Sequence, residues 1–108
     1  SEKLDAETRA GLLDKARRGE VVVIDVRSPA EYEAGHLPFA RSMPLPELRQ
    51  RLAELPADKE IVAYCRGPFC MMSIEAVALL KEQGYRARKV SDGLPEWRAA
   101  GLPVEQEG

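Results

Sequence analysis

Both cysteines of this 108-residue chain lie in one short segment, YCRGPFCMMS, which spans residues 64–73. The apolar residues 61–63 before it predict a buried β-strand, and the apolar spacing after it predicts a helix over residues 72–83. Cys65 therefore lies at the turn from a strand into a helix. The unpaired N–H groups and partial positive charge at a helix start favour the thiolate form of such a cysteine. We expect Cys65 to be a nucleophile toward an electrophilic sulfur atom or a tetrahedral oxyanion.

The residues that follow Cys65 predict a loop that binds anions. Gly67 allows the backbone to approach a ligand closely, and Pro68 stiffens the loop. Arg66 adds positive potential. Successive N–H groups that point inward would form a nest for a negative charge.

Each cysteine also has a simpler interpretation. A cysteine at a strand end is often a small buried hydrophobic residue, although the glycine–proline loop favours the reactive role for Cys65. Cys70 either packs in the first turn of the helix, serves as a resolving thiol for Cys65, or accepts sulfur itself. A separation of five residues does not guarantee disulfide geometry. Two cysteines and His36, the only histidine, make a poor zinc site, so we expect no metal and no cofactor.

Three other polar residues are candidates for the site. Asp25 and Arg27 follow a β-branched run and either line a ligand crevice or form an ion pair that ties loops together; we favour the ion pair. His36 is either a base for Cys65 or a structural residue of the loop that follows Gly35, and we favour the structural role.

Strands and helices alternate along the chain with short connections. This pattern predicts an α/β domain with a mainly parallel central sheet and right-handed crossovers. Ser28 and Pro29 form a helix start, with Ser28 as the N-cap. We expect helices within residues 6–19, 29–34, 46–55, 72–83 and 92–101, and strands at 21–26, 60–65 and 85–91 with a short one near 40–43.

In a parallel sheet the ligand crevice lies beyond the carboxyl ends of the strands. Asp25 and Arg27 follow the first long strand, Cys65 follows the second, and residues 91–93 follow the third. We therefore expect these three positions to converge, with the third strand nearer an edge of the sheet.

Composition limits the possible partners and compartment. The chain suits one domain, residues 1–108, and its 16 basic and 18 acidic residues are interspersed, with a net charge of −2. This balance argues against direct nucleic-acid binding. No apolar run approaches the roughly 20 residues of a membrane span, and from the acidic, polar N-terminus we expect no signal peptide. Two cysteines are too few for a secreted disulfide scaffold, so we expect a cytoplasmic protein and no membrane partner.

Three blocks of sequence together resemble the single-domain rhodanese family over about Val21–Val104. They contain a strand with Asp-x-Arg and Gly-His-Leu-Pro, the cysteine loop, and a Gly-Tyr strand followed by a glycine turn and a tryptophan. The blocks read VIDVRSPAEYEAGHLPFA, IVAYCRGPFC and ALLKEQGYRARKVSDGLPEW.

The resemblance implies a three-layer rhodanese-like domain, with its core at about residues 20–104, and a sulfurtransferase activity. Cys65 would take sulfane sulfur from thiosulfate or a persulfide donor and pass it to a thiol or to cyanide. Asp25 and Arg27 would support the site. The substrate-binding residues would be Arg66, Gly67, Pro68, Phe69, Cys70 and Met71.

The loop departs from the usual family pattern of Cys-Arg-x-Gly-x-Arg. Cys70 stands in place of the second basic residue, which weakens the cationic recognition of thiosulfate. Met71 stands where the related phosphatase branch has an arginine, which disfavours phosphatase activity. The loop also resembles rhodanese domains that follow an ArsR-type repressor. That resemblance implies an alternative function: a redox or reactive-sulfur or arsenic sensor that uses a Cys65/Cys70 dithiol, with a fused or partner regulatory domain.

Overall fold

Two β-branched, apolar runs form the centre of a four-stranded sheet. The computed structural model describes residues 6–67, 70–90 and 92–106. Its strands occur in the order β2-β1-β3-β4, and every neighbouring pair is parallel, which confirms the predicted α/β architecture. The strand bounds are β1 Val21–Asp25, β2 Arg41–Ser42, β3 Glu60–Tyr64 and β4 Ala87–Lys89. The strand that the sequence predicts at residues 85–91 corresponds to β4, and it lies at the edge of the sheet as expected.

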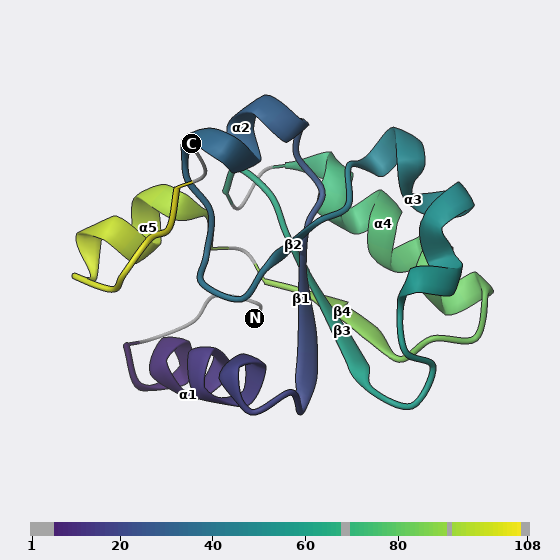
Figure 1. Ribbon diagram of the computed structural model, residues 1–108, viewed down its shortest axis with the longest axis horizontal. Helices are drawn as coiled ribbons and strands as arrows, with labels where there is room; N and C mark the ends of the chain where they lie inside the picture. The colour runs from purple at the N-terminus through teal and green to yellow at the C-terminus, as the bar shows by residue number, and fades with distance from the viewer. Residues whose placement is uncertain (1–5, 68–69, 91, 107–108) are drawn as a thin grey trace.

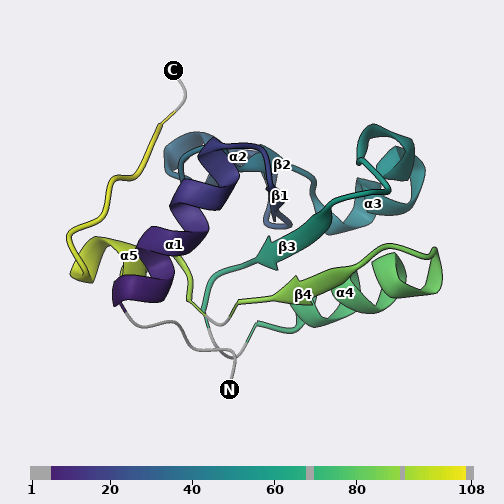
Figure 2. The ribbon, with the colours of Figure 1, turned by 90° about the horizontal axis from the view of Figure 1, so that it is seen from below.

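Helices cover both faces of this sheet (Figures 1 and 2). The helix bounds are α1 Ala6–Arg17, α2 Pro29–Ala34, α3 Leu45–Arg51, α4 Met71–Glu82 and α5 Leu94–Ala99, with a 3₁₀ turn at Leu52–Glu54. Because successive strand side chains point to opposite faces, the apolar strand residues divide between two cores. Ile24 packs in the core beneath α3 and α4, whereas Val23 packs in the core beneath α1 and α5. Both central strands are thus buried on both sides.

Local sequence signals set several of the helix bounds. Ser28 caps α2: its hydroxyl accepts from the backbone N–H of Glu31, and the Glu31 carboxylate accepts from the backbone N–H of Ser28. Gly19 and Gly84 have φ values of 77° and 90° and follow the ends of α1 and α4, where a left-handed residue ends the helix. No helix in the described part of the chain is long and apolar enough to cross a membrane.

Two elements are shorter than the sequence predicts. The expected helix at residues 46–55 divides into α3 and the 3₁₀ turn, and the hydroxyl of Tyr85 donates to the Leu52 carbonyl at 2.8 Å there. The expected strand at residues 85–91 is reduced to β4, although backbone hydrogen bonds from Ile61 N–H to Arg86 and from Val90 N–H to Ala63 extend the pairing on either side of it. Residue 91 lies outside the described residues.

Candidate active site

Cys65 directly follows the last residue of β3 and is 1% exposed. The strand register pairs Asp25 with Tyr64, so β1 and β3 end side by side. In Figure 1, α2 and the first turn of α4 lie at this same end of the sheet. The local sequence thus places Cys65 where the buried strand ends and the chain turns toward the N-terminus of α4.

The two cysteines are joined by a disulfide bond. Their Cα atoms are 6.2 Å apart, and Cys70 is the N-cap residue of α4. The Cys70 N–H donates to the Gly67 carbonyl at 3.3 Å, which keeps the second cysteine close to the start of the loop. The sequence left the geometry of this pair open; the fold brings the sulfur atoms within bonding distance. Cys70 also packs against the core beneath α4, so its packing and thiol roles are compatible.

The turn after β4 lies directly against the start of the cysteine loop. A Cβ atom at Gly93 would lie 2.6 Å from the carbonyl carbon of Arg66 and 3.0 Å from the carbonyl oxygen of Cys65. Such distances require glycine, which has no side chain at this close approach of two backbones. The predicted convergence of the ends of β3 and β4 is therefore confirmed for Gly93.

An ion pair attaches α1 to this same turn. Arg9 Nε lies 2.6 Å from the Asp92 carboxylate, which is 1% exposed. The pairing was not predicted because 83 positions separate the two residues. A buried carboxylate needs a cation or hydrogen-bond donors, and Arg9 supplies a cation beside Gly93.

The end of β1 carries a buried polar network. The Arg27 side chain contacts both Asp25 carboxylate oxygens at 2.7–3.2 Å, and it donates to the Gly35 carbonyl at 2.7 Å. The Tyr64 hydroxyl donates to Asp25 at 2.6 Å and accepts from the Leu37 N–H at 3.1 Å. The predicted Asp25–Arg27 ion pair is confirmed, and Tyr64 is a partner that the sequence analysis missed. A tyrosine at a buried strand position was a usable signal, since its hydroxyl needs a hydrogen-bond partner.

Burial and charge determine ionisation in this network. Burial raises the pKa of Tyr64 well above its ordinary value, and the nearby Asp25 charge raises it further. Burial disfavours the charged form of Arg27, but the hydrogen bond and negative charge of Asp25 outweigh it and raise the pKa. The network therefore holds an ionised guanidinium and a neutral tyrosine.

Arg66, the cation of the loop, turns toward α2. Its guanidinium contacts both Glu31 carboxylate oxygens at 2.7 and 2.8 Å. Hydrogen bonding to Arg66 and to Ser28 outweighs burial and lowers the pKa of Glu31 to about 2. The same hydrogen bond and the Glu31 charge raise the pKa of Arg66. Much of the positive potential predicted for Arg66 is thus balanced by a carboxylate.

His36 serves a structural role, as we favoured. Its ring stacks on Tyr32 with 3.7 Å between centroids, and Nδ1 lies 2.8 Å from the Tyr32 carbonyl oxygen. Its backbone pairs with that of Glu105 through two hydrogen bonds of 2.9 Å. The histidine therefore fastens the loop after α2 to the C-terminal segment.

The remaining predicted loop residues differ in how far they can be placed. Gly67 is half-buried and Met71 is 61% exposed. Pro68 and Phe69 lie outside the described residues.

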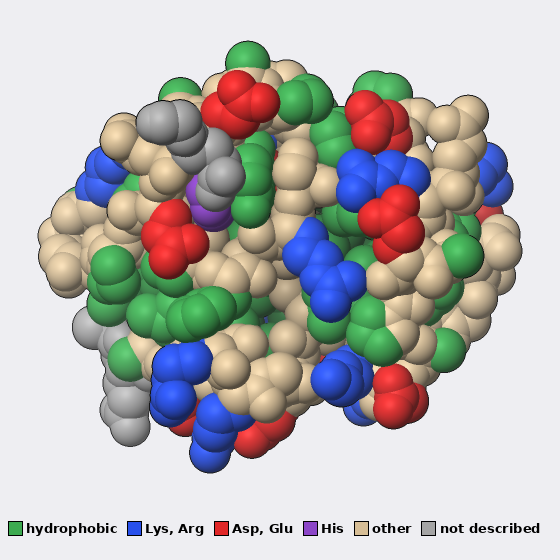
Figure 3. Space-filling model, in the orientation of Figure 1, with side chains coloured by type: hydrophobic (Ala, Val, Ile, Leu, Met, Phe, Trp, Pro, Cys, Tyr) green, Lys and Arg blue, Asp and Glu red, His purple; other side chains and the backbone are tan. Residues whose placement is uncertain are grey.

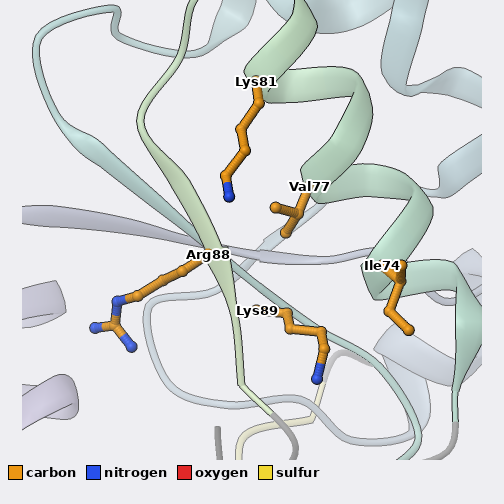
Figure 4. Close-up of a pocket in the computed structure, with 5 residues that line it drawn as sticks. All are labelled: Ile74, Val77, Lys81, Arg88 and Lys89. Atoms are coloured by element: carbon orange, nitrogen blue, oxygen red, sulfur yellow. The ribbon is translucent and has the colours of Figure 1, made fainter. Parts of the chain in front are cut away.

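Two grooves lie elsewhere on the molecule. One, of about 230 Å³, lies between α4 and β4 and is lined by Ile74, Val77, Lys81, Arg88 and Lys89 (Figure 4). Another, of about 360 Å³, is formed by α1, the loop before β2 and the C-terminal segment. The described linings of both include no residue of the cysteine loop. On the face in Figure 3, acidic and basic side chains alternate without a large patch of one sign.

Comparison with known proteins identifies the family of this site. The family model for the rhodanese-like domain matches residues 8–100. The chain is 50% identical over 102 residues to the HTH-type transcriptional regulator Rv0324 of Mycobacterium tuberculosis, covering 94% of this chain but only 45% of the regulator. It is 34% identical over 103 residues to a sulfurtransferase of Allochromatium vinosum, covering 94% of this chain and 92% of that protein.

A solved structure supports the same assignment. The thiosulfate sulfurtransferase from Pseudomonas aeruginosa aligns with a TM-score of 0.79 and 31% identity, over 98% of this chain and 20% of that one. The fold, the family match and the sequence identities agree: this chain belongs to the rhodanese-like domain family.

Proposed function

We propose that this domain is a sulfurtransferase with Cys65 as its sulfur carrier. In the reduced protein, the Cys65 thiolate attacks the outer sulfur of thiosulfate or of a persulfide donor. The bond to that sulfur forms, the donor's S–S bond breaks, and sulfite or a thiolate leaves. A thiol or cyanide then removes the outer sulfur and regenerates the Cys65 thiolate. The observation that carries the proposal is the position of Cys65, between the end of β3 and the N-terminus of α4.

The backbone near Cys65 suits an anionic persulfide. The first N–H groups of a helix have no partners within the helix, and α4 begins one residue after Cys70. These groups and the helix dipole stabilise negative charge near the sulfur. We assign substrate binding to the backbone of the loop Arg66–Met71, which a substitution of the Cys70 side chain leaves in place. We assign a supporting role to Asp25 and Arg27, which hold the neighbouring strand end.

The test is the intact mass of reduced protein after incubation with thiosulfate, with sulfite measured in the same sample. The Cys70→Ser variant retains Cys65 but lacks the second thiol. We expect it to gain one sulfur atom that cyanide can remove. Cys65→Ser should gain no sulfur and release no sulfite. Undiminished sulfite release by Cys65→Ser would disprove the assignment of the nucleophile.

A thiol–disulfide switch is the second candidate function. The Cys65–Cys70 disulfide favours this function. The similarity to a transcriptional regulator also favours it, because the matched segment is only 45% of that regulator. Such a module would react to oxidants or reactive sulfur with little turnover and would change its contacts with a fused or partner regulatory domain. In a reducing cytoplasm the dithiol would be its resting form. Both thiols remaining titratable after mild oxidation would exclude this function.

A further inference from the structure

We propose that Cys70 attacks the Cys65 persulfide and releases its outer sulfur as sulfide. The inference rests on the proposed function, which supplies the persulfide. Its structural basis is the disulfide bond: the fold brings the Cys70 sulfur within bonding distance of the Cys65 sulfur. The Cα separation of 6.2 Å lies within the usual range for such a bond.

The geometry selects which sulfur atom is attacked. A Cys65 persulfide has an inner sulfur, which is Cys65 Sγ, and an outer sulfur received from the donor. The fold aligns Cys70 Sγ with the inner atom, because that is the atom to which it bonds. An external acceptor approaches from solvent and takes the outer atom instead. Attack by Cys70 on the inner sulfur therefore gives sulfide and a disulfide, whereas attack by an external acceptor on the outer sulfur gives a sulfurated acceptor.

The step balances without an outside reagent. The Cys70 thiolate forms a bond to Cys65 Sγ, the bond between Cys65 Sγ and the outer sulfur breaks, and that electron pair leaves with the outer sulfur as hydrosulfide. The proton released by the Cys70 thiol appears on sulfide or in solvent. The sulfane sulfur is reduced and the two cysteines are oxidised. Starting from thiosulfate, one chain would yield one sulfite, one sulfide and one disulfide.

The surroundings of the two cysteines suit a reversible bond. Cys65 is held by the end of β3 and by the close contact of its carbonyl with Gly93. Cys70 is partly exposed, and its side chain makes no capping hydrogen bond to α4. A dithiol reductant would attack the Cys70 sulfur, with Cys65 as the leaving thiolate stabilised by the helix start. With such a reductant the domain would turn over as a sulfide-releasing enzyme.

The experiment compares reduced wild type with Cys70→Ser under anaerobic conditions, each given excess thiosulfate without cyanide or thiol. Sulfite, sulfide and intact mass are measured after one turnover. Cys70→Ser should release sulfite and retain one added sulfur. Wild type should release sulfite and sulfide in equal amounts and lose two hydrogens. Because the attacking thiol is intramolecular, we expect at least about tenfold more sulfide from wild type.

Each other outcome has a distinct meaning. Sulfite release with a persulfide that persists equally in both proteins overturns this inference but leaves the sulfurtransferase function intact. Added sulfur found on Cys70 by peptide mapping also overturns it, because the outer sulfur was then attacked. No sulfite from either protein overturns the proposed function, and the resolving step with it. Cys70→Ala serves as a second variant, so that the result does not depend on the serine hydroxyl.

Discussion

The ends of β1 and β3 lie side by side in the sheet, yet they are built in opposite ways. At the end of β1, Asp25 and Arg27 are buried, and hydrogen bonds to each other and to the Gly35 carbonyl hold them in one arrangement. At the end of β3, the chain leaves the core through an exposed Arg66 and a cysteine pair that can be oxidised or reduced. The polar network also supports the end of β3, because Tyr64, the last residue of that strand, donates to Asp25.

The largest effect should come from breaking the network at the end of β1. In Asp25→Ala the Arg27 guanidinium would remain buried without its carboxylate, and Tyr64 would lose its acceptor. Loss of one partner of a buried ion pair costs on the order of 3–5 kcal/mol. Urea unfolding of the reduced protein, followed by circular dichroism, measures the loss of unfolding free energy.

The matched control for this variant is Asp14→Ala. Asp14 of α1 pairs with Arg17 and with Arg18, which follows the helix; these side chains are exposed, and exposed ion pairs contribute about 1 kcal/mol or less. Equal losses in the two variants would contradict the claim that the buried network supports the end of β1. If Asp25→Ala fails to fold, Asp25→Asn retains the side-chain volume and should show a smaller loss with the same sign.

A smaller loss of stability, but a direct effect on the loop, is expected for Gly93→Ala. The new methyl group would collide with the Arg66 and Cys65 carbonyls and push the start of the cysteine loop outward. Overpacking of this kind costs about 1–3 kcal/mol. Because a displacement of about 1 Å can cost a hundredfold in rate, sulfur loading should fall by at least about tenfold.

Gly11→Ala provides the contrast. Gly11 lies within α1, and no neighbouring atom comes within 4 Å of the position that an added methyl group would take. Alanine should therefore stabilise the helix by up to about 1 kcal/mol. Sulfur loading, measured by intact mass against time, should match that of wild type. Normal loading in Gly93→Ala would show that contact with the turn after β4 does not position the loop.

The sequence predicted the parts of the molecule that depend on neighbouring residues. The β-branched runs identified β1 and β3, Ser28 and Pro29 identified the start of α2, and Asp25 lies two positions from Arg27. The parallel sheet followed from the alternation of elements. These features could be predicted because the interacting residues lie within one turn, strand or loop.

Other contacts at the site depend on how the chain folds in three dimensions, and their neighbouring residues did not reveal them. Arg66 and Glu31 are 35 positions apart, and either could have been a solvated surface charge. The cysteine spacing was compatible with both separate and bonded thiols, and the folded chain joins the two in a disulfide. The position of Gly93 after a strand predicted that it lies near the crevice, but not how closely it approaches the Arg66 carbonyl.

The smallest effect should come from Glu31→Gln, which tests how far α2 controls the charge of the loop. Glutamine keeps an oxygen for the Ser28 N–H, so the helix cap survives while the charge that balances Arg66 is lost. At neutral pH the variant should lose about 1 kcal/mol or less of unfolding free energy, since Arg66 is 59% exposed and its ion pair is screened by solvent. The freed guanidinium should lower the KM for thiosulfate by about twofold, an effect that weakens with added salt.

The pH dependence of this variant has a definite sign. The pKa of Glu31 is about 2 in the folded protein and 4.5 without its partners, so the unfolded chain takes up the proton first as pH falls. The contribution of Glu31 to stability is therefore complete above about pH 4.5 and is lost as pH falls toward 2. The gap in unfolding free energy between wild type and Glu31→Gln should narrow over that window.

The control for the effect on KM is Glu47→Gln, which breaks an ion pair with Arg51 on α3 and should leave the KM for thiosulfate unchanged. An equal change in KM for the two variants would contradict this prediction. The KM would then depend on the net charge of the protein and not on the ion pair between Glu31 and Arg66.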